Sequence, residues 1–242
     1  MEIASVDPKL LERLRALHTD SVWGELDRHG YSNQFMAGLE VIRPDLKMVG
    51  RALTVRYVPQ RLDVLEKYLG ARDRVLTAEA IELVESNDIL VFDVQGYTRC
   101  GGIGDQMIAR LIVRGGTGMV VDGGLRDLDI LRTMDIPLYI KMAHAAPLHD
   151  YVAVDINVPV QCCGVTVMPG DVLLGDSQGV IAIPPEIAEE VVAAAEELER
   201  KESFFAAKIM EGNLTVQESH PPSKELIEEY EEYRKSQKAA KG

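Results

Sequence analysis

The middle of the chain alternates between short apolar runs and helical patterns, and this alternation restricts the fold more than any other feature of the sequence. Continuous apolar runs, typical of strands buried on both faces, occupy residues 89–94, 118–122 and 138–140. Helical patterns over residues 105–114 and 127–134 separate these runs. Because parallel strands can be joined only by a crossover, such alternation is typical of a parallel sheet. We therefore predict an α/β protein with a parallel sheet at its centre.

Further helices and strands are predicted on both sides of this centre. Towards the N-terminus we expect a helix from Pro8 to about Leu17, a strand over 49–58, and helices over 21–28, 62–69 and 78–84. After Pro147, short strands separated by turns predict an added antiparallel sheet, over 152–156, 158–161, 164–167 and 180–183. Two helices follow, one over 186–210 and a last acidic one. The last helix carries an apolar stripe, formed by Leu226, Ile227, Tyr230 and Tyr233. We expect this stripe to pack against the protein's own core or against a neighbouring subunit.

Charge and composition exclude several classes of function. The 242 residues carry 39 Asp and Glu against 26 Lys and Arg, a formal charge of −13, whereas a nucleic-acid groove needs clustered cations. No apolar run approaches the roughly 18 residues that span a bilayer, and the N-terminal stretch lacks the apolar core of a secretory signal. The three cysteines form no metal or disulfide motif. We therefore expect a cytoplasmic protein that binds neither nucleic acid nor membrane.

Two segments that follow neighbouring strands of the predicted sheet combine glycines with charged side chains. Residues 101–107 read Gly-Gly-Ile-Gly-Asp-Gln-Met, and residues 121–127 read Val-Asp-Gly-Gly-Leu-Arg-Asp. The carboxyl ends of parallel strands lie at one edge of a sheet, and loops and helix N-termini meet there. We therefore expect the two segments to meet and to form a ligand site.

The residue types in these segments suit the binding of an anion and a hard cation. The backbone amides of Asp105, Gln106 and Met107 open a helix and lack intrahelical partners, so they can hold an anion. The guanidinium of Arg126 matches a carboxylate or a phosphate with two parallel hydrogen bonds. Asp105 and Asp127 are oxygen donors of the kind that Mg²⁺ and Mn²⁺ take, usually together with several waters.

Each residue also has a structural interpretation. Asp105 could serve only as the N-cap of a helix, and Arg126 and Asp127 could form only a surface ion pair. Gly123 and Gly124 could form only a tight turn. What favours a site is that two acids, one guanidinium and two glycine loops are predicted at one edge of the sheet.

Two other kinds of site are compatible with parts of the sequence. Gly102 and Gly104 follow a strand and open a helix, with Asp122 twenty residues after Gly102, as in a dinucleotide or S-adenosylmethionine site. Met107 stands at the third glycine position of the dinucleotide-binding motif, so the sequence matches this motif only in part. Lys141, at the end of the strand 138–140, is the lysine best placed for a Schiff base.

The spacing of these residues resembles the signature of a known family. Gly104 and Asp105, then twenty residues, then Arg126 and Asp127 within Val-Val-Asp-Gly-Gly-Leu-Arg-Asp (120–127), are similar to the motif of the RraA-like family. That family includes the class II 4-hydroxy-4-methyl-2-oxoglutarate/4-carboxy-4-hydroxy-2-oxoadipate aldolases and the regulator of ribonuclease E activity A.

The resemblance extends over about residues 15–212, because residues 49–55 and 169–180 resemble an early and a late strand of the family. It implies a layered α/β/β/α sandwich of the swivelling phosphohistidine-domain-like type. It also implies an RraA-like catalytic domain over 1–212, followed by an acidic helical extension over 213–242. The expected assembly is a homotrimer or a homohexamer with active sites at subunit interfaces.

The resemblance also implies roles for the candidate residues. In the family's aldolases, the residue matching Asp127 ligates a divalent metal and the one matching Arg126 binds the substrate carboxylate. The stretch matching Gly104, Asp105, Gln106 and Met107 holds the substrate, and the acid matching Asp105 contacts metal-bound water. Asp105 and Arg126 are therefore the expected catalytic residues.

The implied reaction is metal-dependent lyase chemistry. Cleaving a C–C bond beside a 2-oxo acid leaves a pyruvate enolate, which Mg²⁺ or Mn²⁺ stabilises as a Lewis acid. Retro-aldol cleavage and oxaloacetate decarboxylation share this enolate, and Asp105 is the candidate for proton transfer. The alternative is a non-catalytic, protein-binding regulator of ribonuclease activity. Such regulators lack the metal aspartate, so the presence of Asp127 favours an enzyme.

Two departures from the family pattern concern the substrate. Gln106 and Met107 stand where the family has leucines, and Phe205 stands where its aldolases have a glutamate. The identity of the 2-oxo acid therefore does not follow from the resemblance. His144 and His149 are expected to be structural or solvated, since their spacing suits no common metal motif.

Overall fold

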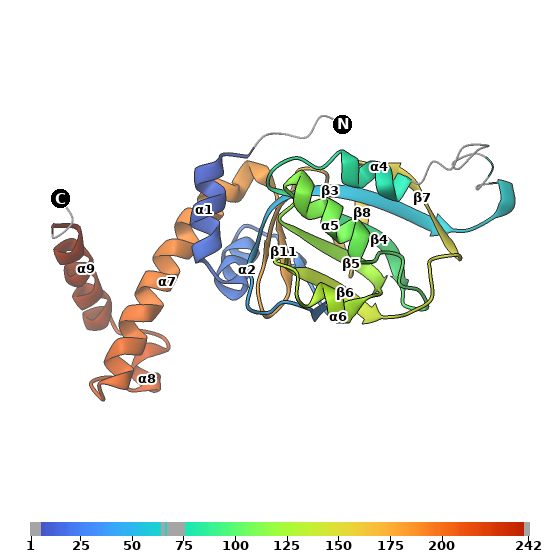
Figure 1. Cartoon of the computed structure of the whole chain (residues 1–242). Helices are drawn as coiled ribbons and strands as arrows, with labels where there is room; N and C mark the ends of the chain where they lie inside the picture. Colours follow the sequence, from blue (N-terminus) through green and yellow to red (C-terminus); the bar gives the residue numbers. More distant parts are fainter. Residues whose placement is uncertain (1–5, 64–65, 67–75, 240–242) are drawn as a thin grey trace. The chain divides into compact units, whose positions relative to one another are not determined.

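A mixed sheet with the order β1-β11-β10-β3-β4-β5-β6-β2, in which β7 also pairs with β3, forms the centre of the protein (Figure 1). The computed structural model describes residues 6–63, 66 and 76–239. The predicted helix over 62–69 therefore lies mostly outside the described residues. The strands are β1 (Phe35–Met36), β2 (Glu40–Val41), β3 (Met48–Pro59), β4 (Asp88–Tyr97), β5 (Gly118–Leu125), β6 (Leu138–Ala143), β7 (Tyr151–Ile156), β10 (Val172–Gly175) and β11 (Val180–Ile183).

The four adjacent strands β3, β4, β5 and β6 are parallel, as the alternation of strands and helices predicted. Their crossovers contain α4 (Leu76–Glu82), α5 (Asp105–Arg114) and α6 (Leu128–Leu131). The helix predicted over 127–134 is therefore shorter than expected, and turns follow it. The apolar residues of α4 and α5 and one set of alternating strand residues form a single buried core.

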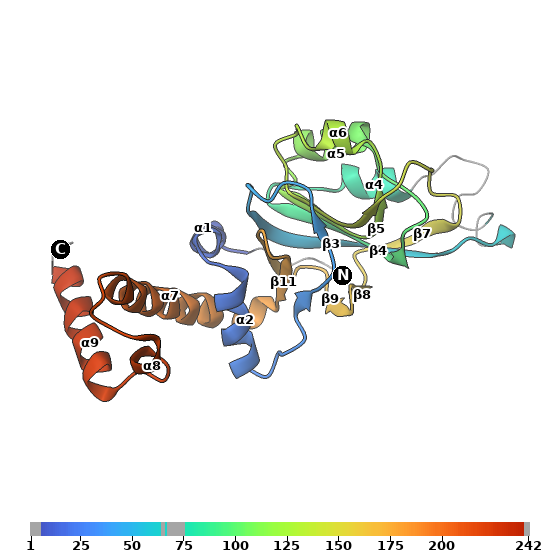
Figure 2. The ribbon, with the colours of Figure 1, turned by 90° about the horizontal axis from the view of Figure 1, so that it is seen from below.

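The opposite face of the sheet is covered by a two-stranded hairpin, β8 (Val160–Cys162) and β9 (Val165–Val167). A second core, built from the other set of strand residues and from both hairpin strands, lies between the two layers. Figure 2 shows the helices α4, α5 and α6 on one side of the sheet and the hairpin on the other. The predicted α/β class, with helix, sheet and second β layer, is confirmed.

The prediction of a separate antiparallel sheet was wrong for two of its four strands, β7 and β11. β7, β10 and β11 join the central sheet through antiparallel pairs, and only β8 and β9 form a sheet of their own. β10 lies within residues 169–180, which the family resemblance marks as a late strand, but local periodicity did not identify it because the run Val172–Gly175 is short and does not alternate. Local periodicity identifies a strand but does not specify its partner, which depends on contacts that are distant in sequence.

The N-terminal helices agree with their sequence signals. α1 (Pro8–Ala16) begins after Asp7, whose side chain accepts a hydrogen bond from the amide of Lys9. α2 (Thr19–Arg28) begins two residues earlier than predicted. Its first residue, Thr19, binds the buried carboxylate of Asp176 through both its amide and its hydroxyl.

The chain divides into two compact units, Met1–Val192 and Ala193–Gly242. The helix α7 (Ala188–Met210) contributes to both, and the second unit adds α8 (Val216–Ser219) and α9 (Lys224–Ala239). Two residues of the predicted apolar stripe, Ile227 and Tyr233, are 37% and 44% exposed. Within the second unit, Phe205 packs against the other two, Leu226 and Tyr230. Because Phe205 lies on α7, this helix covers Leu226 and Tyr230. The domain boundary at residue 212 stays a prediction.

Within the described residues, no helix is both long and apolar enough to span a membrane.

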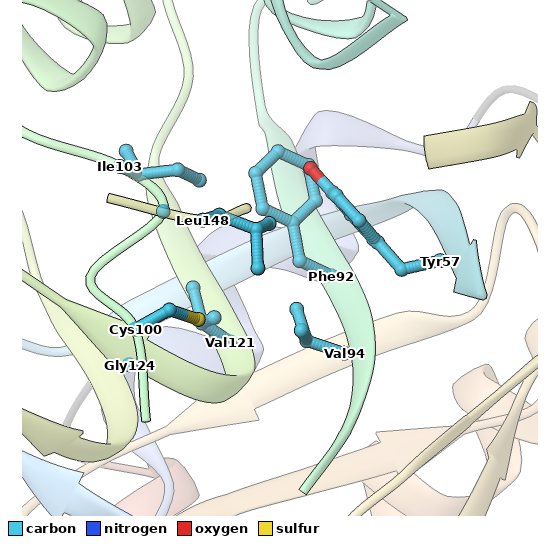
Figure 3. A pocket seen from close by; sticks show the side chains of 9 residues that line it. Tyr57, Phe92, Val94, Cys100, Ile103, Val121, Gly124 and Leu148 are labelled. Carbon is cyan, nitrogen blue, oxygen red and sulfur yellow. The ribbon is translucent and has the colours of Figure 1, made fainter. Parts of the chain in front are cut away.

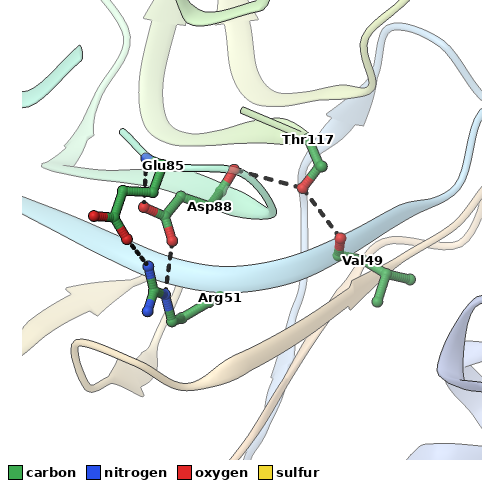
Figure 4. Close-up of polar contacts among 5 residues, drawn as sticks. All are labelled: Val49, Arg51, Glu85, Asp88 and Thr117. Carbon is green, nitrogen blue, oxygen red and sulfur yellow. Dashed lines mark hydrogen bonds and ion pairs between the residues drawn. The ribbon is translucent and has the colours of Figure 1, made fainter. Parts of the chain in front are cut away.

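A buried ion pair joins the amino ends of the parallel strands (Figure 4). Arg51 Nε on β3 lies 2.7 Å from Asp88 Oδ1 on β4, and the other oxygen of Asp88 accepts the amide of Glu85 at 2.9 Å. The side chain of Asp88 is 2% exposed and that of Arg51 is 14% exposed. The hydroxyl of Thr117, just before β5, donates a hydrogen bond to the carbonyl of Val49. These contacts are at the end of the sheet opposite to the two glycine-containing loops.

Replacing Arg51 with Met should lower the free energy of unfolding by about 3 kcal/mol, because the buried carboxylate of Asp88 loses its guanidinium partner. Urea denaturation followed by circular dichroism measures this. Arg61→Met is the matched control, since its pair with Asp63 is largely exposed and should contribute nothing measurable. Equal stability of the two variants would show that the Arg51 pair does not hold the strands together.

A second buried carboxylate makes the stability of the fold depend on pH. Asp171 is 4% exposed and accepts the amide of Met168 at 2.8 Å, which closes the turn before β10. Burial raises the pKa of its carboxyl to about 6. Because the charged form is the one that burial disfavours, the fold is most stable with respect to this group below pH about 4. That stability is lost as the pH rises through about 6.

Asp171→Asn should remove this pH dependence, since the amide stays neutral and its oxygen can still accept the Met168 bond. We expect the variant to be more stable than the wild type at pH 8, by up to about 3 kcal/mol, and equal to it at pH 4. Urea denaturation of both proteins at the two pH values tests this. A variant that is less stable at pH 8 would mean that the ionised carboxylate stabilises the turn.

Candidate active site

The two glycine-containing loops lie side by side at the carboxyl ends of β4 and β5. Residues Ile103 and Leu125 form a parallel bridge, and the amide of Arg126 donates to the carbonyl of Ile103 at 3.1 Å. The amide of Gly102 donates to the carbonyl of Gly124 at 3.2 Å. The loop before α5 therefore continues the sheet for a few residues, and this fixes the start of α5 beside the end of β5.

Gly104 allows the charged side chains to approach the loop closely. A Cβ atom at this position would lie 2.2 Å from Oδ2 of Asp127 and 3.0 Å from Nε of Arg126. Because a Cβ atom cannot approach an oxygen to 2.2 Å, any other residue at 104 would displace the Asp127 carboxylate. Gly104 also takes the N-cap position of α5, where Asp105 had been considered as the cap.

Asp105, Arg126 and Asp127 meet at one carboxylate oxygen. Oδ2 of Asp127 lies 3.4 Å from the amide nitrogen of Asp105 and 3.4 Å from Nε of Arg126. The carboxylate of Asp105 turns back to its own helix, where Oδ1 accepts the amide of Gln106 at 2.8 Å. The side chains of Arg126 and Asp127 therefore meet, whereas Asp105 contributes its backbone amide and not, as expected, its carboxylate. The side chains of Arg126 and Asp127 are 46% and 34% exposed, so a small molecule can reach both.

The backbone of Asp127 directs its carboxylate towards α5. Asp127 has φ = 62°, a left-handed conformation that few residues other than glycine adopt, and it stands at the N-cap position of α6. Its side chain forms no capping bond with α6 and contacts Asp105 and Arg126 instead. Residues held in such conformations concentrate at functional sites, where the surrounding structure maintains the strain.

A cleft of about 380 Å³ opens beside Arg126. Arg126 and Met107 line it on the side of the two loops, and Leu148, His149 and Tyr151 line it on the side of the segment that leads into β7. Of the residues predicted to bind substrate, Met107 and Arg126 thus line the same cleft, and their roles stay predictions. Gln106 is exposed on the first turn of α5 and is not among the lining residues.

The wall formed by residues 144–151 was not expected from the sequence. The amide of Gly101 donates to the carbonyl of Ala146 at 2.6 Å, and Leu148 packs over Gly102, where a Cβ would lie 3.1 Å from its side chain. Leu148 lies between Ile103 and Phe92 and lines a small cavity of about 10 Å³ (Figure 3). No local pattern marks this segment as a wall of the site, because its position depends on contacts with the glycine loop.

The residues present fit a divalent cation of the Mg²⁺ type. Among the described residues, no three His, Cys, Asp or Glu side chains converge into a complete metal cage. Mg²⁺ does not need such a cage, because it is commonly held by one or two carboxylates together with waters and substrate oxygens. Asp127 provides a half-exposed carboxylate, and Asp105 provides a second one at the adjacent helix start.

The structure opposes the two other kinds of site. Asp122 is 2% exposed, and its two oxygens accept the amide of Cys163 at 3.0 Å and its thiol at 3.6 Å. A ribose cannot reach this carboxylate. Asp122 therefore cannot be the acid that binds the ribose in a dinucleotide site. Nζ of Lys141 lies 3.9 Å from Asp122 and 3.3 Å from the carbonyl of Ala37. Lys141 is also not among the residues that line the cleft beside Arg126, so a substrate bound there would not meet its amine.

Phe205 is not part of any polar site. It is 6% exposed and belongs to the apolar core of the second compact unit, together with Leu226 and Tyr230. The position that matches the family's glutamate is thus a packing position in this chain.

Relatives with the same fold have been named for two kinds of activity. A protein of Halalkalibacterium halodurans, provisionally named a 4-hydroxy-4-methyl-2-oxoglutarate aldolase, is 26% identical over 195 residues, which cover 81% of this chain and 85% of the relative. The crystal structure of Streptomyces coelicolor RraAS2, described as an unusual member of the RNase ES inhibitor RraA protein family, has a TM-score of 0.74. It is 28% identical, with 84% of this chain and 98% of that chain covered.

A third similar structure has no activity in its description. It is an uncharacterized protein from Pseudomonas syringae pv. tomato strain DC3000, with a TM-score of 0.80 and 25% identity. The match covers 92% of this chain and 98% of that chain. The layered RraA-like fold inferred from the sequence is thus confirmed by structural neighbours. Since the family model for RraA-like proteins (Aldolase/RraA) also matches residues 17–182, the chain belongs to the RraA-like family.

Proposed function

We propose that the protein is a divalent-metal-dependent lyase that cleaves a C–C bond in a 2-oxo acid and releases pyruvate. The reaction resembles that of a 4-hydroxy-4-methyl-2-oxoglutarate aldolase, and the same site would decarboxylate oxaloacetate. The observation that carries the proposal is the meeting of Arg126, Asp127 and the Asp105 amide at one oxygen, beside an open cleft. The names of the aldolase relatives support it.

The cation, Mg²⁺ or Mn²⁺, would be held by Asp127, with Asp105 next to it. Bound there, a divalent ion supplies a Lewis acid for the oxygens of the 2-oxo acid. Arg126, whose side chain is 46% exposed and lines the cleft, would bind the substrate carboxylate through its guanidinium and add positive potential. The start of α5 also faces this place, since the amide of Asp105 points at Asp127.

We assign proton transfer to Asp105. Its Oδ1 is fixed by the amide of Gln106, which holds the carboxylate at the start of α5. In a retro-aldol cleavage, a base takes the proton from the 4-hydroxyl oxygen, the C3–C4 electron pair stays on C3, and C3 then takes a proton. Asp105 would act at the 4-hydroxyl oxygen, and the guanidinium of Arg126 would stabilise the charge that develops on the pyruvate half.

The assembly remains part of this proposal. We infer a homotrimer or a homohexamer with the active site at a subunit interface, as the family resemblance implies. Because Phe205 packs inside the second unit, the neighbouring subunit would contribute something other than the glutamate of the family's aldolases.

Replacing Asp127 with Ala should lower pyruvate release at least 100-fold, since the carboxylate that would hold the cation is removed. The measurement is pyruvate release from oxaloacetate and from 4-hydroxy-4-methyl-2-oxoglutarate, with excess Mg²⁺ or Mn²⁺ and after treatment with EDTA. Asp129→Ala is the matched control, because this fully exposed acid two residues away should be dispensable.

Two results would count against the lyase. One is equal activity of Asp127→Ala and wild type, and the other is activity that survives EDTA.

Replacing Arg126 with Lys should lower kcat/KM about 10- to 100-fold, mainly through a higher KM. The substitution keeps the charge but removes the pair of parallel hydrogen bonds that a guanidinium makes to a carboxylate. Steady-state kinetics on the same substrates measure both constants. Arg132→Lys, a neighbouring exposed arginine, should leave them unchanged. An unchanged KM for Arg126→Lys would place the substrate carboxylate elsewhere.

The second candidate function is protein binding without catalysis, which the likeness to S. coelicolor RraAS2 favours. That protein is described as a member of the RNase ES inhibitor family, and it covers as much of the fold as the aldolase relative does. A wild-type protein that releases no pyruvate with either metal, and that lowers the cleavage rate of a ribonuclease E-type enzyme, would support this function instead.

A further inference from the structure

Three polar side chains that lie outside the two glycine-containing loops also line the cleft beside Arg126. They belong to Gln60, which follows β3, and to His149 and Tyr151, which lie just before and at the start of β7. We call these three residues the distal donor group, because an amide, an imidazole and a phenol hydroxyl can each donate a hydrogen bond. The cleft volume of about 380 Å³ lies within the range of sites that enclose a whole small molecule.

The pairing of β3 with β7 holds the backbone of the distal donor group in place. Pro59 and Tyr151 are paired residues of these two strands, and the amide of Gln60 donates to the carbonyl of Asp150 at 2.7 Å. The ring of Tyr151 packs against the ring of Tyr97 on β4, and the two ring centroids lie 4.7 Å apart. This part of the cleft is therefore built on the sheet itself.

The donors of this group are available to a ligand. None of the three side chains makes a hydrogen bond or an ion pair with another residue that the structure describes. In the same cleft, by contrast, the hydroxyls of Tyr57 and Thr77 lie 2.7 Å apart and bind each other. Gln60 and His149 are exposed and Tyr151 is partly buried, so a ligand in the cleft can reach all three.

The charge of the cleft wall favours a ligand with two negative groups. The chain has 39 Asp and Glu residues, yet none of the described residues that line the cleft is an acid. Among those described residues, Arg126 carries the permanent positive charge. Asp150, next to His149, accepts a hydrogen bond from the hydroxyl of Tyr97 and does not line the cleft. One carboxylate therefore matches the guanidinium, and a second one meets donors without a like charge in the wall.

We propose that the cleft binds a 2-oxo dicarboxylic acid through both of its carboxylates. Arg126 binds the carboxylate beside the 2-oxo group, and the distal donor group binds the second carboxylate, chiefly through His149 and Gln60. These residues thereby select a diacid over the monoacid of the same length. The inference deepens the proposed lyase function, on which it rests for the reaction, since 4-hydroxy-4-methyl-2-oxoglutarate is such a diacid. The binding preference can be measured without catalysis.

The test compares two acids of equal carbon number, 2-oxoglutarate and 2-oxopentanoate, by isothermal titration calorimetry of the full chain with Mg²⁺. They differ only in the terminal group, a carboxylate against a methyl, and both lack the 4-hydroxyl that retro-aldol cleavage needs. Because hydrogen bonds to an ionised group typically change affinity by about tenfold or more, the dissociation constant of 2-oxoglutarate should be lower by at least that factor. Equal or tighter binding of 2-oxopentanoate, or no measurable binding of either acid, would overturn the inference.

His149→Phe and Gln60→Leu keep the approximate size of each side chain and remove its donors. Each should raise the dissociation constant of 2-oxoglutarate about tenfold and leave that of 2-oxopentanoate unchanged. Gln217→Leu is the matched control and should change neither constant, because Gln217 is exposed on α8 in the second compact unit. Circular dichroism checks folding, and Tyr151→Phe, which removes only a hydroxyl, replaces a variant that does not fold. The inference is wrong if these variants leave 2-oxoglutarate binding unchanged, or if they weaken the binding of both acids equally.

Pyruvate release separates this inference from the proposed function. If 2-oxoglutarate binds more tightly through His149 and Gln60 but no 4-hydroxy-2-oxo acid is cleaved, the lyase function fails and the second carboxylate site stands. If 4-hydroxy-4-methyl-2-oxoglutarate is cleaved but the two acids bind equally, the lyase stands and the distal donor group does not select the substrate.

Discussion

The candidate site depends on one close approach between two loops. Gly104 lets the carboxylate of Asp127 come within reach of the Asp105 amide and the Arg126 guanidinium, which a Cβ atom would prevent. The left-handed backbone of Asp127 turns the carboxylate in the same direction. Both loops are held by the sheet itself, since Ile103 and Leu125 continue its parallel pairing. The chemistry proposed for the protein therefore follows from backbone geometry.

The amino ends of the parallel strands stabilise the sheet, whereas their carboxyl ends carry the candidate site. At the amino ends, the buried pair of Arg51 and Asp88 ties β3 to β4. At the carboxyl ends, the charged groups are partly exposed and the segment 144–151 forms a cleft around them. This division is typical of open α/β sheets, in which ligands bind beyond the carboxyl ends of the strands. It allows the substrate pocket to vary while the core stays constant.

Sequence reasoning predicted those features that local patterns determine. The strands β3 to β6, the helix α5 and the meeting of Asp105, Arg126 and Asp127 follow from periodicity and from the rule that parallel strands end together. It did not predict that β10 and β11 join the central sheet, nor that Leu148 and Tyr151 line the cleft. These features depend on contacts between residues far apart in the chain, which no short window of sequence contains. The burial of Asp122 under the β8–β9 hairpin was missed for the same reason.

The central claim is that Asp127 and Arg126 hold a divalent ion and a 2-oxo acid next to each other. A crystal structure of the full chain soaked with Mn²⁺ and oxalate, which imitates the planar pyruvate enolate, tests this most directly. The account predicts an anomalous Mn²⁺ peak at the carboxylate of Asp127, with oxalate in contact with both the ion and the guanidinium of Arg126. Mn²⁺ bound at another place, or oxalate bound without contact to Arg126, would contradict it.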